Sequence, residues 1–373
     1  MYKKLVLPAS LLAGVIIGAG MFSLPFLFRS VGILTGLFYL LFFSAVFIIV
    51  YFVYGDIILR TAGQHRLVGY ARLYLGRGGF WFALWMGLIQ LFFVLTVYLI
   101  LAPSFSELFL PHSRILQVLL FWVVGSFVIL YEGRKIALLE FLITFGMVAI
   151  IGLVFWFGVP SFLELYPDWG NIDVTRILIA GPILFALSGT LAIPEVISYF
   201  REARVSKRFI ASALIVGGVL PAIVYAIFVA GVLGLSAIVS EDAITGLIGQ
   251  VPGWFLILFG VLGVFTLISS YIVVGLNVRR VLEFDLGWSA AVSQWSVVFG
   301  PLLIYFLITK DFLDLISFIG SILLPIESLL VFVMWYRMNK KSPEPPILAH
   351  KLVQWCIPVA ALVFGVVLVL GLI

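Results

Sequence analysis

Cysteine, histidine and charged residues are scarce in this chain of 373 residues, and each shortage excludes a kind of chemistry. The single cysteine, Cys356, excludes an internal disulfide and a metal cluster built from cysteines. The three histidines fall in predicted loops, which argues against a buried histidine metal site. Only 10% of the residues are charged, whereas about a quarter is usual for a soluble domain. A soluble globular protein is therefore excluded.

Most of the chain consists of long apolar runs. Hydrophobic residues make up 64% of the chain, and the mean hydropathy is +1.26. Several runs exceed the roughly 20 residues that a helix needs to cross a bilayer, and their lack of alternation does not suit barrel strands. We therefore expect a single all-α integral membrane domain surrounded by lipid. The net charge of +5 does not indicate nucleic acid, because clustered base-reading motifs are absent.

The hydropathy pattern predicts eleven transmembrane helices with short linkers. Their expected ranges are 5–28, 31–59, 79–109, 114–131, 136–159, 175–199, 209–235, 251–278, 288–308, 312–336 and 352–373. If the N-terminus is cytoplasmic, 18 of the 22 lysines and arginines lie on the cytoplasmic side. This excess is the expected topology signal. It predicts a plasma (inner) membrane protein with a cytoplasmic N-terminus and, because the number of spans is odd, an extracytoplasmic C-terminus.

Glycine and proline interrupt two of these spans in the same way. The first span has glycines within residues 18–21 and a proline at Pro25, and the sixth has Ser188 and Gly189 ahead of Pro194. Lipid cannot satisfy the backbone groups that such a break exposes, so the break must line a cavity or bind something. Paired breaks point to a secondary transporter built from inverted repeats. We expect a first repeat at 1–159, a second at 175–336 and an extra helix at 352–373.

The two breaks suggest a site for a zwitterion. Amide groups freed in the first span would bind a carboxylate, and carbonyls freed in the sixth would accept from an ammonium group. Packing of small residues is the alternative for the first break, and a kink without a ligand is the alternative for the sixth. The predicted substrate-binding residues are Gly18, Ala19, Gly20, Met21, Tyr98, Phe185, Ala186, Leu187, Ser188 and Gly189. Tyr98, in the third span, either reaches the cavity or packs.

Acids and hydroxyls within the spans are candidates for ion coupling. An ionisable residue at membrane depth is costly and therefore a functional candidate. Glu195 is predicted to carry a proton or act as a gate, with an ion pair to Arg201 or Arg204 as the alternative, and Glu327 is a second candidate. Thr266, Ser269 and Ser270 share a helical face. Near Gly18, Ser269 and Ser270 would suit sodium, unless these hydroxyls only join helices.

Residues 14–25, which read GVIIGAGMFSLP, resemble the opening signature of bacterial aromatic amino acid permeases, the tryptophan/tyrosine permease family. The broader amino acid/auxin permease family is similar. Residues 193–195 resemble the end of that group's sixth helix, and residues 98–100 resemble its third helix. The resemblance implies a LeuT-type fold of the amino acid–polyamine–organocation superfamily, with discontinuous helices one and six. It also implies amino acid uptake coupled to protons or sodium.

Two departures from the family pattern bear on coupling. Gly189-Thr190 stands where the wider family often has Gly-His, and Gly14 stands where its sodium-coupled members commonly have asparagine. The second departure favours protons. We therefore expect an ion-coupled symporter for aromatic or large neutral amino acids. The alternative is a transporter-like amino acid sensor, such as a germinant-receptor subunit, that binds without transport. No enzyme activity, cofactor, metal or nucleic-acid partner is expected, and the oligomeric state stays open.

Overall fold

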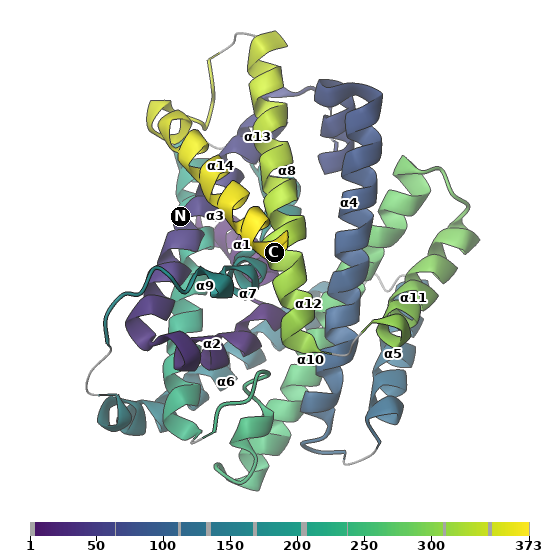
Figure 1. Ribbon diagram of the computed structural model, residues 1–373. Helices are drawn as coiled ribbons and strands as arrows, with labels where there is room; N and C mark the ends of the chain where they lie inside the picture. Colours follow the sequence, from purple (N-terminus) through teal and green to yellow (C-terminus); the bar gives the residue numbers. More distant parts are fainter. Residues whose placement is uncertain are drawn as a thin grey trace.

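In the computed structural model, the described residues are 4–63, 65–110, 113–131, 136–166, 170–202, 207–236, 238–308, 311–341 and 345–372. Within these ranges all regular structure is helical (Figure 1). Nine helices in this part of the chain are long and apolar enough to cross a membrane, and a bent pair at its start makes ten. Helix α5 (Arg114–Tyr131) lies at the predicted fourth span, but its apolar part, Arg114–Leu130, is shorter than the nine helices counted here. The count of eleven therefore stays a prediction.

The predicted first span is a pair of helices with a break between them. Helix α1 (Val6–Ile16) is followed by the 3₁₀ helix η2 (Ala19–Ser23) and by α2 (Leu24–Val31), and the two halves are bent by 56°. The bend arises because Ile17 and Gly18 have extended backbones, with ψ of 98° and −157°. The break predicted from the glycines is confirmed.

The sixth span is broken in the same manner. It enters through the 3₁₀ helix η3 (Ile177–Ile179) and continues as α7 (Ala180–Leu187), η4 (Thr190–Ala192) and α8 (Ile193–Glu202). Ser188 is extended, with ψ of 122°, and Gly189 is non-helical. Pro194 lies in the first turn of α8, where its missing N–H would have no intrahelical partner. This second predicted break is also confirmed.

The other helices are continuous except for local irregularities. They are α3 (Ile33–Arg60), α4 (Leu67–Ser106), α6 (Ile136–Leu165), α9 (Lys207–Leu235), η5 (Thr245–Leu247), α10 (Gly253–Arg280), η6 (Val281–Asp285), α11 (Ala290–Leu307), α12 (Phe312–Phe318), η7 (Ile319–Leu323), α13 (Leu324–Lys341) and α14 (Lys351–Leu372). Helix α4 begins twelve residues before the predicted start at 79, because a kink at Gly76 joins an extra segment to it. The φ of 77° at Gly76 suits glycine.

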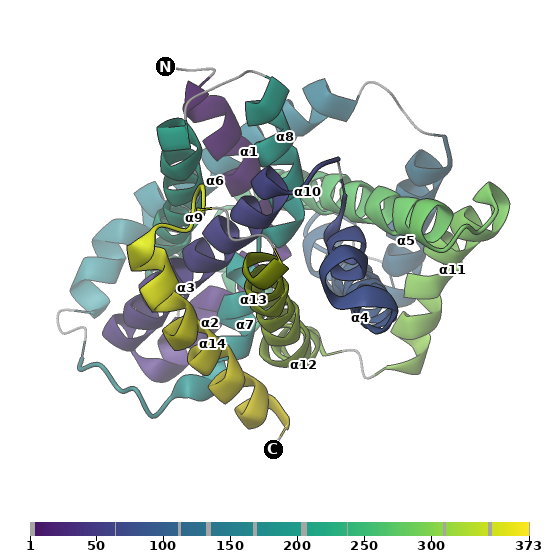
Figure 2. The same cartoon turned by 90° about the horizontal axis from the view of Figure 1, so that it is seen from above.

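The helices form two groups with α12 and α13 between them (Figure 2). Helices α4, α5, α10 and α11 pack on one another, and we call them the scaffold. Helices α1, α2, α3, α7, α8 and α9 form the second group, which we call the bundle. Helix α13 contacts α3 of the bundle and α4 of the scaffold, and α14 lies outside along α13 and α3. Side chains of α13 are therefore placed at the seam between the groups.

Candidate functional site

The two breaks cross each other at small residues. A Cβ added to Gly20 would lie 2.5 Å from Cα of Ala186, and one added to Gly189 would lie 2.5 Å from Cγ1 of Ile16. Both glycines therefore serve close packing, and for Gly20 this is the small-residue alternative given for the first break. Around Gly18, the nearest such neighbour is the carbonyl oxygen of Ile16 at 3.9 Å. Gly18 thus has the space for a ligand that Gly20 and Gly189 lack.

Two buried tyrosines bind carbonyls that the breaks release. The Tyr225 hydroxyl, on α9, lies 2.7 Å from the Ile16 oxygen and 2.9 Å from the Ala186 oxygen. The Tyr51 hydroxyl, on α3, donates to the Leu187 oxygen at 2.8 Å. A tyrosine hydroxyl thus lies within hydrogen-bonding distance of each of these carbonyls, and the single Tyr225 proton is shared between the Ile16 and Ala186 oxygens. Each carbonyl oxygen keeps a second lone pair.

The other residues predicted from the breaks lie at this crossing rather than on cavity walls. Ala19 and Met21 are buried in the core, with 3% and 0% of their surface exposed. Phe185 and Ser188 are partly buried. None of these four lines either of the two cavities described below. The side chains of Ala19, Met21 and Phe185 belong to the core or pack against it.

The predicted ion-coupling hydroxyls line a cavity beside the first break, which we call the α1–α10 cleft. Ser269 and Ser270 of α10 lie in its wall together with Gly14 and Ile17 of the first span and with Tyr98 of α4. The structure thus brings these serines beside the first break, although Gly18 itself does not line the cleft.

Thr266 also lines the cleft, and its hydroxyl donates to the Leu262 carbonyl at 2.8 Å. Among the described residues, no three His, Cys, Asp or Glu side chains are grouped to hold a metal. Beside the first break the cleft therefore offers a cation hydroxyl and backbone oxygens, and elsewhere in its wall the Glu195 carboxylate and the Asn277 amide oxygen.

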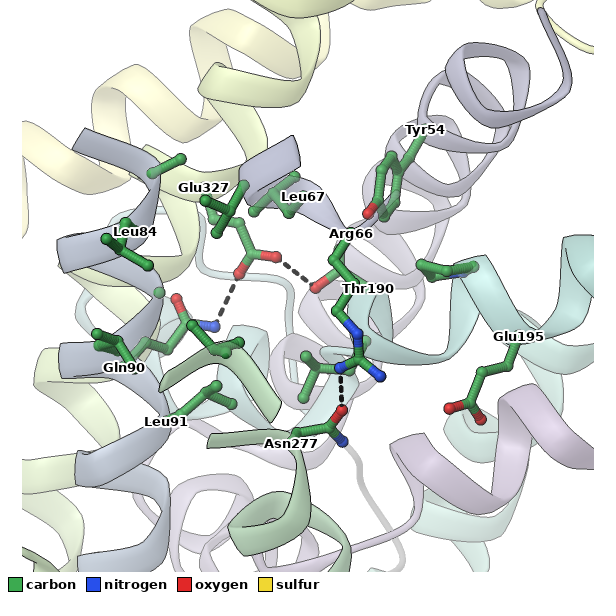
Figure 3. Close-up of a pocket in the computed structure, with 17 residues that line it drawn as sticks. Tyr54, Arg66, Leu67, Leu84, Gln90, Leu91, Thr190, Glu195, Asn277 and Glu327 are labelled. Carbon is green, nitrogen blue, oxygen red and sulfur yellow. Dashed lines mark hydrogen bonds between the residues drawn. The ribbon is translucent and has the colours of Figure 1, made fainter. Parts of the chain in front are cut away.

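A second cavity lies between α4, the break in the sixth span and α13, and we call it the Glu327 cavity (Figure 3). Its apolar wall comes from α4 and includes Ala83, Leu84, Gly87 and Leu88. Leu191, Glu195 and Asn277 line both this cavity and the α1–α10 cleft. The two cavities therefore adjoin at the start of α8.

Glu327 on α13 is held by neutral partners from both helix groups. Gln90 Nε2, on α4, donates to Glu327 Oε2 at 2.7 Å, and Thr190 Oγ1, in η4, donates to Oε1 at 2.7 Å (Figure 3). Gln90 and Thr190 are buried, whereas Glu327 is partly exposed and lines the cavity. No lysine or arginine pairs with this carboxylate in the described part of the chain. Glu327 is thus an acid within a predicted span that has no cationic partner among the residues that the structure describes.

Glu195 differs from Glu327 in its surroundings. Its side chain is exposed, although the sequence suggested a residue enclosed at membrane depth. The alternative of an ion pair with Arg201 is wrong, because the Arg201 guanidinium donates instead to backbone carbonyls at the end of α3, including Thr61 at 2.9 Å. Arg204 lies outside the described residues. Glu195 therefore stays a coupling candidate through its position where the cavities meet.

Arg66 is a residue of the site that sequence reasoning missed. It precedes α4, and its guanidinium donates to the Asn277 side-chain oxygen of α10 across the Glu327 cavity (Figure 3). The Asn277 amide also donates to the Val273 carbonyl at 3.1 Å, which fixes its orientation. In the sequence, Arg66 contributes only to the topology count, and no motif marks its partner.

A cluster of aromatic rings fills the space between the two helix groups at the end opposite Arg66 and Asn277. Phe22, directly after the first break, lies with its ring centroid 4.8 Å from Phe105, 5.7 Å from Phe228 and 6.5 Å from Phe259. All four side chains are buried. Phe105 is near the end of α4 and Phe259 near the start of α10, whereas Arg66 and Asn277 mark the other ends of these helices. The site is therefore closed on the α2 side, and its cavities lie on the α1 side.

Solved structures with the same arrangement are transporters. MhsT in complex with L-phenylalanine is 17% identical, with a TM-score of 0.64 over 97% of this chain and 98% of that one. Mhp1, a nucleobase-cation-symport-1 family transporter with bromovinylhydantoin bound, is 15% identical, with a TM-score of 0.60 over 98% and 88%. The manganese transporter of Eremococcus coleocola is 13% identical, with a TM-score of 0.59 over 98% and 93%. The fold is therefore that of a LeuT-type membrane transporter.

The sequence narrows this class to one family. Residues 1–371 match the tryptophan/tyrosine permease family, and the chain belongs to it. None of the curated proteins matches the chain. The resemblance seen in residues 14–25 is confirmed, and the protein is a multi-pass permease rather than a catalytic enzyme.

Proposed function

We propose that this protein is an ion-coupled secondary active transporter of aromatic or large neutral amino acids. The observation that supports it most is the crossing of two discontinuous helices at Gly20 and Ala186, beside cavities between two helix groups. The family is named for tryptophan and tyrosine, and the similar MhsT holds L-phenylalanine. Both support an aromatic substrate.

The backbone around Gly18 would hold the amino acid by its charged ends. Amide groups at the start of η2 would donate to the carboxylate, because a helix N-terminus favours an anion. The second lone pairs of the Ala186 and Leu187 oxygens would accept from the ammonium group. Tyr225 and Tyr51, which already bind these oxygens, would keep them in place when the site is empty.

Transport would proceed by alternating access, with the bundle rocking against the scaffold. The rings around Phe22 would separate to open the α2 side, and on the α1 side the bundle would close against the scaffold near Arg66 and Asn277. We place the α1 side in the cytoplasm of the plasma (inner) membrane, following the distribution of basic residues. The C-terminus would then lie outside.

Protons are the proposed coupling ion, with Glu327 and Glu195 as the carriers or gates. The support for Glu327 is its neutral set of hydrogen-bond donors. Sodium is the alternative, and its place would be beside Ser269 and Ser270 next to the first break. Uptake driven separately by a pH gradient and by a sodium gradient distinguishes the two.

The function is tested with purified protein in liposomes, using each of the twenty amino acids under imposed proton and sodium gradients. We expect aromatic amino acids to accumulate under a pH gradient that is acidic outside. Absence of uptake for all twenty would contradict transport. Binding without uptake, seen as a thermal shift, would indicate the amino acid sensor that the sequence left as the alternative.

A further inference from the structure

We infer that Glu327, Thr190 and Gln90 form the proton-coupling site, and that Thr190 transmits the protonation of Glu327 to the break in the sixth span. This inference rests on the proposed function, because it assigns the coupling step of that transporter to particular atoms. We call the three residues the coupling triad. Glu327 is the group that takes the proton, and Thr190 and Gln90 are positioning residues.

The coupling triad joins three parts of the fold that alternating access must move apart. Gln90 belongs to α4 of the scaffold, Thr190 to η4 within the bundle, and Glu327 to α13 at the seam between them. Both hydrogen bonds are 2.7 Å long (Figure 3). A change in the charge of Glu327 therefore acts on both helix groups at once.

The donors determine which carboxylate oxygen takes the proton. An amide nitrogen can only donate a hydrogen bond, so Oε2 stays an acceptor opposite Gln90. A hydroxyl can donate or accept, so Oε1 can take a proton while it stays bonded to Thr190. In that step a hydronium ion from the acidic side transfers its proton to Oε1 and leaves as water. The new O–H then donates to Thr190 Oγ1, and the hydroxyl proton of Thr190 turns away.

Protonation weakens the hold on the broken helix. A hydrogen bond to an ionised carboxylate is about twice as strong as one between neutral groups, so adding the proton loosens both bonds of the coupling triad. Thr190 begins the turn that follows Gly189, and Gly189 packs against Ile16 at the end of α1. Loosening this turn therefore acts directly on the break in the sixth span, and through the contact between Gly189 and Ile16 it also acts on the break in the first span.

Other ionisable groups face the same cavity from the elements around Glu327. Arg66 lies before α4, Glu195 is on α8, and Tyr54 is on α3. The hydroxyl of Tyr51, also on α3, donates to the Leu187 carbonyl. The Arg66 guanidinium is bonded to Asn277 and not to Glu327. The proton is thus the simplest available means to compensate the charge of Glu327.

The test compares accumulation with exchange in liposomes. Accumulation of labelled tryptophan under a pH gradient requires coupling, whereas exchange with internal unlabelled tryptophan does not. For Glu327→Gln, which keeps a neutral group of the same shape, we expect accumulation to fall by about tenfold or more, with exchange retained and its pH dependence lost. Wild-type accumulation and pH profile in Glu327→Gln would overturn the inference.

Thr190 is tested by a pair of substitutions and a matched control. Thr190→Val keeps the shape and removes the hydroxyl, so we expect the same loss of accumulation, whereas Thr190→Ser should restore it. Thr96→Val is the control, because the buried Thr96 hydroxyl donates to backbone carbonyls, Phe92 at 2.9 Å and Pro301 at 3.3 Å, and to no side chain in the described part of the chain. Equal pH profiles for Thr190→Val and Thr96→Val would overturn the role of Thr190.

Infrared titration of the reconstituted protein gives a readout that does not need transport. We expect a protonated-carboxyl band that titrates in the wild type, is absent in Glu327→Gln, and shifts its midpoint in Thr190→Val but not in Thr96→Val. If no such band belongs to Glu327, the coupling triad is overturned even if uptake is observed. If the band behaves as expected but no amino acid is transported, the triad is supported and the proposed function fails.

Discussion

The hydroxyl of Tyr225 on α9 lies 2.7 Å from the carbonyl oxygen of Ile16, the last residue of α1. The same hydroxyl is 2.9 Å from the Ala186 oxygen in α7. One side chain from a neighbouring helix therefore spans both interrupted spans. A membrane helix can end in the middle of the protein only if such a group replaces the missing backbone partner.

Replacing this hydroxyl should destabilise the crossing. Tyr225→Phe leaves the carbonyls of Ile16 and Ala186 without their donor, which costs about 1–3 kcal/mol. The free energy of unfolding in detergent should fall by that amount, and amino acid binding should weaken. Tyr271→Phe is the control, because the buried Tyr271 hydroxyl makes no hydrogen bond in the described part of the structure. Equal losses in both variants would contradict this account.

Substitution of the two glycines of the first break should have different effects, because Gly20 serves packing and Gly18 serves ligand binding. Gly20→Ala places a methyl group 2.5 Å from Cα of Ala186, and such overpacking costs about 1–3 kcal/mol. Gly18→Ala meets no side chain within 4 Å, so we expect nearly unchanged stability but weaker binding. Thermal unfolding with and without amino acid measures both effects. A stable Gly20→Ala variant, or unchanged binding in Gly18→Ala, would contradict this division.

Asp56, which the sequence did not mark, should be a major determinant of stability. It is fully buried in α3 and accepts from the Trp335 indole at 2.9 Å and from the backbone amides of Ile347 and Leu348 at 2.6 and 2.9 Å. It also pairs with Arg60 at 3.2 Å. Removing one partner of a buried pair costs about 3–5 kcal/mol.

Asp56→Ala should therefore lower the free energy of unfolding by about 3–5 kcal/mol and speed hydrogen exchange at the amides of residues 347–350. Asp173→Ala is the matched control, because Asp173 and Arg176 form a pair with 43% and 52% of their side chains exposed. An exposed pair is worth about 0–1 kcal/mol. A small effect of Asp56→Ala would show that segment 345–350 is held by packing alone.

The loop between α9 and α10 should loosen as the pH rises. Burial and the nearby Asp311, Asp314 and Asp242 raise the pKa of Glu241 above its ordinary value of 4.5. An acid with a raised pKa in the folded state stabilises it below the ordinary pKa, and this contribution is lost as the pH rises through the raised value.

In the wild type, hydrogen exchange of residues 238–247 should therefore become faster as the pH rises from the ordinary pKa of Glu241 through its raised pKa. The glutamine of Glu241→Gln cannot ionise. After correction for the intrinsic pH dependence of amide exchange, the exchange rate of its loop should therefore stay nearly constant over the same pH values. A wild-type loop with no pH dependence of protection, or an unchanged dependence in Glu241→Gln, would contradict the assignment to this carboxyl.

Much of the site was predictable because it depends on backbone chemistry. Glycine and proline act on the helix in which they lie, so both breaks appear at the predicted residues. The helical segment before residue 79 was missed because the kink at Gly76 separates it from the apolar span that follows. Roles of individual glycines were not predictable, since they depend on what the sixth span places beside Gly18 and Gly20.

By itself, the sequence determined that this is an all-helical membrane protein, where its helices are interrupted, and to which family it belongs. Hydropathy and helix-breaking residues act on the segment in which they lie, and so their effects can be predicted from the sequence alone. Only the tertiary structure decided that Tyr225 binds both breaks, that Arg66 reaches Asn277, and that Glu327 meets Thr190 and Gln90. These partners are far apart in the chain, and the packing of whole helices brings them together.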